Sequence, residues 1–310
     1  MQPPGRCEAL ARRLPAYTMT RRHLLTLLAT TPLSAMDVSL PRFAALTRNF
    51  SRSATMPALF IGHGHPMNAL LDNDFTRHLT RLGQELERPQ AVLVVSAHWL
   101  TTGTAVSVNP RPPIIYDFGD FDPALFQVKY PAPGAPDIAR TLKQHVTLTE
   151  VREADRMGLD HGTWTVLKFI YPRADVPVFQ LSIDHTQPAD FHYRLAQELR
   201  YLRERGVLII GSGNLVHNLG LLNWSDIQAP TFDWALEFDH LAKTRLDAGD
   251  HAALVRYEAL GRSAQLSIPT PDHYWPMLYV LGLQRPHEPL RHLYEGYQFG
   301  SISMRCFQVG

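Results

Sequence analysis

Four unbroken apolar segments of strand length recur along the chain after residue 56. They span residues 57–61, 91–95, 176–183 and 207–210. An apolar run without polar alternation indicates a strand that is covered on both faces. Helical patterns separate these segments, at about 68–86, 136–146, 162–171 and 188–205. This alternation predicts an α/β fold of three layers, α/β/α, with a mostly parallel, mixed central sheet.

The rest of the pattern completes one domain over residues 56–310. Two further helices are expected at about 231–247 and 271–283, before a closing strand at 301–309. Residues 110–136 contain seven prolines and many aromatic side chains, and proline excludes regular structure. We expect a rigid loop there, whose aromatic residues either line a substrate site or cover the core: Tyr116, Phe118, Phe121, Phe126 and Tyr130.

Residues 1–55 read differently from the rest. An arginine pair, Arg21 and Arg22, precedes an apolar run from Leu24 to Ala35 that is too short to span a bilayer. Two interpretations stay open, a twin-arginine export signal and a disordered leader before a start at Met56. The protein is expected in the periplasm if the leader is used and in the cytoplasm otherwise.

Composition narrows the chemistry. The 30 Lys and Arg nearly balance the 29 Asp and Glu, which leaves a net charge of +1, so we expect neither a nucleic-acid partner nor a membrane. The 2 cysteines lie at opposite ends and predict no disulfide framework. The 15 histidines are more than a core needs, and they make nitrogen the expected donor at any metal site.

Three of the four apolar strands end in the same way, with a small residue and then histidine. The motifs are LFIGHGH with His63 and His65, LVVSAHW with His98, and LIIGSGNLVH with His217. The carboxyl ends of parallel strands form the ligand crevice of an open α/β sheet. Each histidine alone is more often structural than a ligand, but their shared placement predicts that they converge on one site.

Two further histidines stand at helix starts. His273 follows Asp272 in PTPDHYWPMLYVLG, and His161 follows Asp160 in GLDHGTWTVL. Asp160 either orients the ring of His161 or caps the helix. His185, after the remaining strand, is ambiguous. Charged neighbours predict a surface position for the other histidines of the domain: His78, His145, His192, His240, His251, His287 and His292.

Several imidazoles with few thiols indicate a borderline transition metal. Three histidines and one open position are typical of a zinc hydrolase, whereas three facial ligands with three open positions suit Fe(II) that binds substrate and O2 together. Ligand type alone does not choose between these cases.

A longer set of motifs carries a family resemblance. The segments PALFIGHGHPMN, AVLVVSAHW, YDFGDF, YPAPG, DHGTW, GSGNLVHN and PTPDHYWPMLYVLG follow in order from about residue 56 to the C-terminus. Together they resemble the class III extradiol ring-cleavage dioxygenases, most closely the 4,5-DOPA dioxygenase type. The resemblance implies the fold of that family's catalytic subunit. It also implies one divalent metal per chain, Fe(II) for activity, although Zn(II) can occupy such a site. The implied substrates are a catechol and O2.

The resemblance also implies roles for individual residues. His63, His98 and His273 match metal ligands, with Asp272 as the alternative to His273. His217 matches an acid/base residue beside the metal that is also a candidate fourth ligand, and His161 matches a residue that contacts substrate oxygen. His65 departs from the family pattern, which commonly has serine there, so its role stays open and it is a candidate extra ligand.

Three functions remain to be tested. The first is an Fe(II) extradiol dioxygenase acting on DOPA or a similar catechol. The second is a zinc-dependent hydrolase or amidase on a related scaffold, and the third is a non-catalytic metal-binding protein. Four charged residues either meet charged groups of the substrate or are simply solvated: Asp117, Asp120, Lys129 and Arg156. Oligomeric state stays open.

Overall fold

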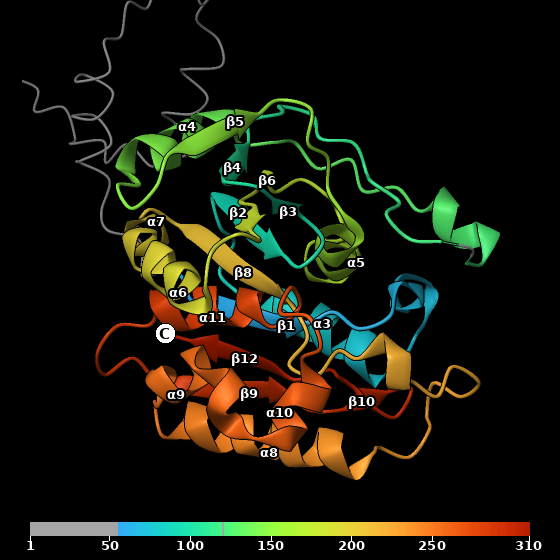
Figure 1. The fold of residues 1–310 in the computed structure, drawn as a ribbon. Coiled ribbons are helices and arrows are strands. Elements are labelled where there is room, and N and C mark those ends of the chain that lie inside the picture. The colour runs from blue at the N-terminus through green and yellow to red at the C-terminus, as the bar shows by residue number, and fades with distance from the viewer. Residues whose placement is uncertain (1–54, 120) are drawn as a thin grey trace, which may run out of the picture. The chain divides into compact units, whose positions relative to one another are not determined.

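A six-stranded mixed sheet organises the molecule (Figure 1). The computed structural model describes residues 55–119 and 121–310. The strand order is β6-β2-β8-β1-β12-β9, and neighbouring strands are parallel from β6 to β1 and antiparallel from β1 to β9. The strands are β6 Val178–Gln180, β2 Ala91–Ser96, β8 Val207–Gly213, β1 Ala58–Gly62, β12 Cys306–Val309 and β9 Leu290–Tyr294.

Both faces of this sheet are buried, as the unbroken apolar runs predict. Along β1, Ala58 and Phe60 join one hydrophobic core, whereas Leu59 and Ile61 join a second core on the other face. Alternate residues of a strand point to opposite faces, so the two cores lie on opposite sides of the sheet. The three-layer α/β/α prediction is confirmed.

The helices divide between these two cores. The first core holds α4 Pro136–His145, α6 Ala189–Glu198, α8 Asp233–Asp247, α9 His251–Val255, α10 Arg262–Ser267 and α11 Trp275–Leu283. Leu202 of α7 Arg200–Glu204 joins them. The second core holds α3 Asp74–Glu85 and α5 His161–Ile170. Every residue of α11 is buried, so this helix runs through the interior beside β8.

Short elements surround this frame. Three two-stranded ladders pair β3 Leu100–Thr101 with β7 Ile183–Asp184, β4 Thr104–Ser107 with β5 Val151–Ala154, and β10 Tyr297–Gln298 with β11 Ile302–Ser303. The 3-10 helices are η2 Pro66–Leu70, η3 Pro123–Gln127, η4 Leu219–Leu221 and η5 Tyr257–Leu260.

The structure corrects several predicted boundaries. The helix expected at 68–86 is a 3-10 turn followed by α3, because Asn73 makes a capping box with Thr76 and starts a new helix. The helix expected to begin at 271 begins at Trp275, so His273 lies in the turn before α11. The twin-arginine motif lies outside the described residues and stays a prediction.

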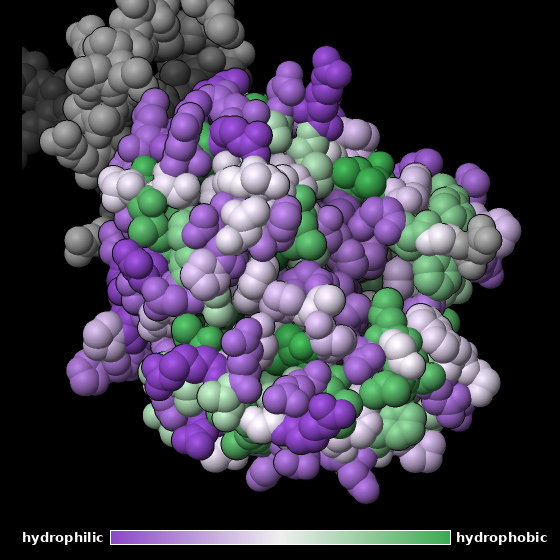
Figure 2. Space-filling model, in the orientation of Figure 1, coloured by the Kyte–Doolittle hydropathy of each residue, from purple (hydrophilic) through white to green (hydrophobic). Residues whose placement is uncertain are grey.

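The proline-rich loop is irregular apart from η3 and a single bridge, as expected. Tyr130 is buried and its hydroxyl donates to the Tyr171 carbonyl, so this residue covers the core. Apolar side chains gather on the protruding part of the loop that carries η3 (Figure 2). Within the described residues, no helix combines the length and apolar character needed to cross a membrane.

Candidate metal centre

His63 follows β1 directly, and its ring is fixed by the neighbouring strand β8. Its Nδ1 lies 3.0 Å from Ser212 Oγ, and that hydroxyl donates to the Gly162 carbonyl at 2.6 Å. A serine hydroxyl has one proton, so Ser212 must accept a hydrogen bond from His63 Nδ1. The Nε2 atom of a neutral His63 therefore carries a free lone pair.

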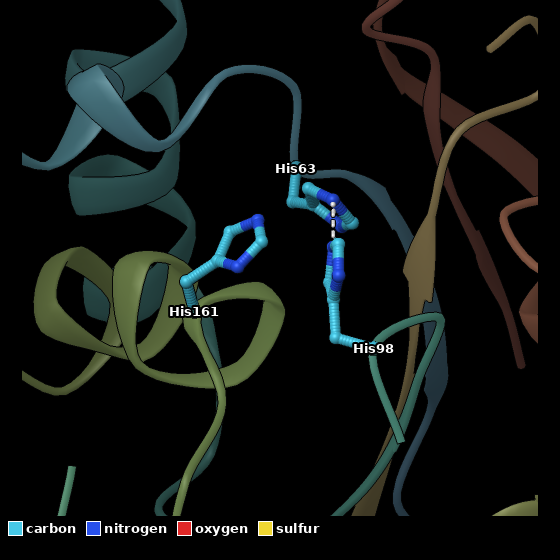
Figure 3. Close-up of side chains that lie close together, drawn as sticks. All are labelled: His63, His98 and His161. Atoms are coloured by element: carbon cyan, nitrogen blue, oxygen red, sulfur yellow. Dashed lines mark hydrogen bonds between the residues drawn. The ribbon is translucent and has the colours of Figure 1, made fainter. Parts of the chain in front are cut away.

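His98 lies two residues beyond β2, and its ring meets that of His63 (Figure 3). The two Nε2 atoms are 3.1 Å apart. Metal–imidazole bonds measure about 2.0–2.1 Å, and two such bonds at ordinary coordination angles place their nitrogens about 3.0–3.4 Å apart. The separation of the two nitrogens thus fits ligation of one ion.

His161 is the first residue of α5, and two aspartates hold this helix start. Asp160 caps the helix by accepting from Thr163 N–H. Asp117, from the proline-rich loop, accepts from the backbone N–H of His161 at 2.9 Å and contacts its Nδ1 at 3.0 Å. The sequence left two roles open for Asp160, and the cap is the one observed. Asp117 orients the ring.

His273 and His217 form the other side of the cluster. Their rings stack with centroids 3.4 Å apart, and Asp272 accepts a hydrogen bond from His273 Nδ1. The Nε2 atom of His273 is buried and has no hydrogen-bond partner among the described residues. A buried polar atom without a partner is costly, and a metal ion would satisfy it.

Burial keeps three rings of the cluster neutral. Desolvation, and then the neighbouring histidines, lower the pKa values of His63, His98 and His217 well below 6.5. Burial alone would raise the pKa of Asp272, but its hydrogen bonds and the neighbouring His273 ring together outweigh burial, and the pKa is lowered. Neutral imidazole is the form that binds a metal, so the donor set fits a divalent transition ion.

Five of the six histidines singled out in the sequence thus meet at one place: His63, His98, His161, His217 and His273. The ring centroid of His273 lies 5.3 Å from that of His63 and 4.9 Å from that of His98. Donor atoms within 4.8 Å of one another form two groups among the described residues. They are His63, His98 and His161, and His217, Asp272 and His273.

His185 and His192 both lie outside the histidine cluster. His185 is exposed and bonds Thr102 Oγ1, away from the cluster. The surface prediction for His192 is wrong, since the residue is fully buried and its Nδ1 lies 3.1 Å from the Tyr279 hydroxyl. Tyr279 belongs to the buried helix α11. The surface prediction rested on the charged neighbours of His192 in the sequence, which do not show that α11 packs against it.

His65 does not join either donor group. Its Nδ1 accepts a hydrogen bond from Met67 N–H, which caps η2. Its ring packs against Phe121 at 4.8 Å and Phe299 at 5.1 Å. Burial, and then the charge of His161, lower the pKa of His65 to about 4.

Phe118 and Phe121 of the proline-rich loop form, together with Phe299, an aromatic wall between His65 and the histidine cluster. Phe118 packs edge-on to His161 at 5.5 Å and to Phe121 at 5.5 Å. The sequence left a substrate contact open for four charged residues. Of these, Asp117 contacts His161, Lys129 donates to the Tyr116 hydroxyl, and Arg156 is exposed. Asp120 lies outside the described residues.

A buried polar network beneath the site was not predicted. The hydroxyl of Ser96 donates to Asp160, Gln180 donates to the other oxygen of Asp160, and His98 N–H reaches Ser96 Oγ. Asp160 thus joins β2, β6 and α5. Its signal in the sequence is a polar residue at or near the end of an apolar strand, as in LVVSAHW and VPVFQLSI.

Comparisons with known proteins agree over most of the chain. Residues 59–306 match a family described as the catalytic LigB subunit of aromatic ring-opening dioxygenase. A protein of Escherichia coli K12 named 4,5-DOPA dioxygenase extradiol is 44% identical over 83% of this chain and 96% of its own length. A protein of the same name from Beta vulgaris is 35% identical over 80% and 94%. The crystal structure of an uncharacterized Escherichia coli K12 protein, 41% identical, superposes with a TM-score of 0.73 over 82% of this chain and all of its own.

Proposed function

Since this chain belongs to the family of the catalytic LigB subunit of aromatic ring-opening dioxygenases, we propose a specific reaction for its histidine cluster. The chain is an extradiol ring-cleaving dioxygenase, and its small-molecule substrates are a catechol and O2. The comparisons give no support to the zinc hydrolase alternative. The proposal concerns the metal, the substrate and the part that each histidine plays.

The proposed metal is Fe(II), held by His63, His98 and His273. The observation that carries this assignment is the pair of Nε2 atoms of His63 and His98, 3.1 Å apart, together with the buried, unpartnered Nε2 of His273. Held there, Fe(II) supplies a positive centre that binds deprotonated catechol oxygens and O2 together, because neutral imidazoles leave its charge of +2 uncompensated.

The remaining histidines handle protons and substrate oxygen. His217 is neutral because burial lowers its pKa, so its ring is able to accept a proton from a catechol hydroxyl and return it later. His161, oriented by Asp117, contacts a substrate oxygen. Phe118 and Phe121 cover the aromatic ring of the substrate and exclude water. The proposed substrate is DOPA or a similar catechol, as the names of the relatives suggest.

An anaerobic reconstitution tests this proposal. Metal-free protein is loaded with Fe(II) or Zn(II), L-DOPA is added, and oxygen is then admitted while oxygen uptake and the visible absorbance of the product are recorded. We expect one O2 consumed per catechol and a yellow semialdehyde product with Fe(II) only. No oxygen uptake with Fe(II), alongside ester or amide hydrolysis with Zn(II), would contradict it.

A further inference from the structure

His65 has a fixed proton that the metal centre does not use. Its Nδ1 accepts from the Met67 N–H at 3.3 Å, so the single proton of the neutral ring lies on Nε2. No hydrogen bond from Nε2 is found among the described residues, and this atom is not among their buried, unpartnered polar atoms. Nε2 is thus an accessible hydrogen-bond donor that has no acceptor among the described residues.

The ring that carries this donor is held in place. Phe121 packs edge-on against it and Phe299 packs on it at an angle of 57°. The backbone N–H of His65 also donates to Gln298 Oε1 at 3.1 Å. A ring fixed by two aromatic neighbours and by a cap loses little freedom when it binds a ligand.

The donor stands at the outer end of the aromatic wall. Phe118 touches His161 at the histidine cluster, Phe121 touches Phe118, and His65 touches Phe121. His63 is buried whereas His65 is half-buried. A catechol whose two oxygens point at the buried histidines therefore extends its ring substituent toward the half-buried end of the wall.

The chemistry of this donor selects one kind of substituent. A neutral N–H whose other nitrogen is already occupied offers a hydrogen bond to an anion and offers nothing to an ammonium group. Aromatic neighbours displace water around it and strengthen such a bond. A carboxylate oxygen is the acceptor that fits.

We propose that His65 determines substrate specificity by donating a hydrogen bond from Nε2 to a carboxylate on the side chain of the catechol. This inference rests on the proposed dioxygenase function. It assigns a role to His65, which the sequence left open, and it predicts that carboxylated catechols bind more tightly than catechol amines.

Anaerobic binding measures this preference without turnover. The Fe(II)-loaded protein is titrated with L-DOPA, with 3,4-dihydroxyphenylpropionate, which lacks the ammonium, and with dopamine, which lacks the carboxylate. We expect both carboxylated catechols to bind about tenfold or more tightly than dopamine, as a hydrogen bond to a charged group allows. In His65→Phe, which keeps an aromatic ring between Phe121 and Phe299, this ratio of Kd values should fall to near one.

The matched variant is His65→Gln, which loses the ring but keeps an N–H donor, and it should retain part of the preference. KM under air should follow the Kd values, whereas kcat should change less. Equal binding of all three catechols by the original protein overturns the inference. So does a preference that survives in His65→Phe, or one lost equally in both variants. Absence of turnover in every protein contradicts the proposed function, while the binding ratios still decide the role of His65.

Discussion

At the scale of single residues, Asp117 shows how one carboxylate determines the use of a histidine. Its two oxygens meet two different donors of His161, the backbone N–H and Nδ1. The same carboxylate lies 3.6 Å from His98 Nδ1. Partners of this kind fix the orientation and the protonated nitrogen of a ring. The loop that carries Asp117 therefore also sets the geometry of histidines in the cluster.

Replacing Asp117 by Asn should lower kcat about 10–100-fold. The amide has one acceptor oxygen for the two donors of His161, so one of them loses its partner. Metal content, measured by elemental analysis, should stay close to that of the original protein. Asp137→Asn, whose side chain is fully exposed, is the control and should leave kcat unchanged. An unaltered kcat in Asp117→Asn would contradict the positioning role.

His98 and His217 should separate metal binding from proton transfer. His98→Ala removes a nitrogen that lies 3.1 Å from His63 Nε2, so the protein should purify with little metal. His217→Ala removes a ring that stacks on His273, so most of the metal should remain while turnover with a catechol is lost. Metal content and oxygen uptake are measured on the same samples. Equal loss of metal in both variants would make His217 a fourth ligand.

The histidines of the site could be found in the sequence because their signal is local. Each follows an apolar strand or precedes a helix, and strand order brings such ends together. Asp117 and His192 gave no such signal. The hydrogen bonds of Asp117 depend on how an irregular loop folds back, and the burial of His192 depends on α11 packing on α6. Both are contacts between distant segments that periodicity does not report.

At the scale of elements, the close approach of α5 to β2 explains the glycine in DHGTW. A Cβ at Gly162 would lie 2.6 Å from Ser96 Oγ and 2.9 Å from Cδ2 of His98. Either distance is far below van der Waals contact. The helix that carries His161 can thus approach the strand that positions His98 only if this residue has no side chain.

Gly162→Ala should therefore damage the site more than the fold. Overpacking at such a contact costs about 1–3 kcal/mol of unfolding free energy, and the displaced His98 should weaken metal binding. Denaturant unfolding and a metal titration measure the two effects. Gly119→Ala, where a Cβ meets nothing within 4 Å, is the control for stability. Normal metal affinity in Gly162→Ala would show that the approach of α5 is not required.

Elements with a continuous apolar pattern were predicted well, and short ones were not. The runs that became β1, β2 and β8 are buried on both faces, so their pattern has no competing explanation. The β4–β5 ladder and β9 were missed. Residues of β9 are exposed or half-buried, and β4 and β5 are only four residues each. Their formation depends on partners far along the chain.

At the scale of the whole molecule, a buried histidine couples stability to pH. His192 of α6 lies against Tyr279 and Trp275 of α11, and burial lowers its pKa to about 4. Between pH 6.5 and 4 the unfolded chain binds a proton at this position that the folded protein does not. The stability that His192 contributes is therefore fully present above pH 6.5 and is lost as the pH falls toward 4.

The contribution of His192 to this decline should reach about 3 kcal/mol. His192→Gln removes the titrating group, so its unfolding free energy should start lower at pH 7.5, where the contact with Tyr279 is altered, but fall less steeply. Urea unfolding of the metal-free protein at several pH values measures both. The histidines of the metal centre are the same in both proteins, so the difference between the two slopes isolates His192. Parallel curves would mean that His192 does not resist protonation in the folded protein, and the α6–α11 contact would then lose its role in acid sensitivity.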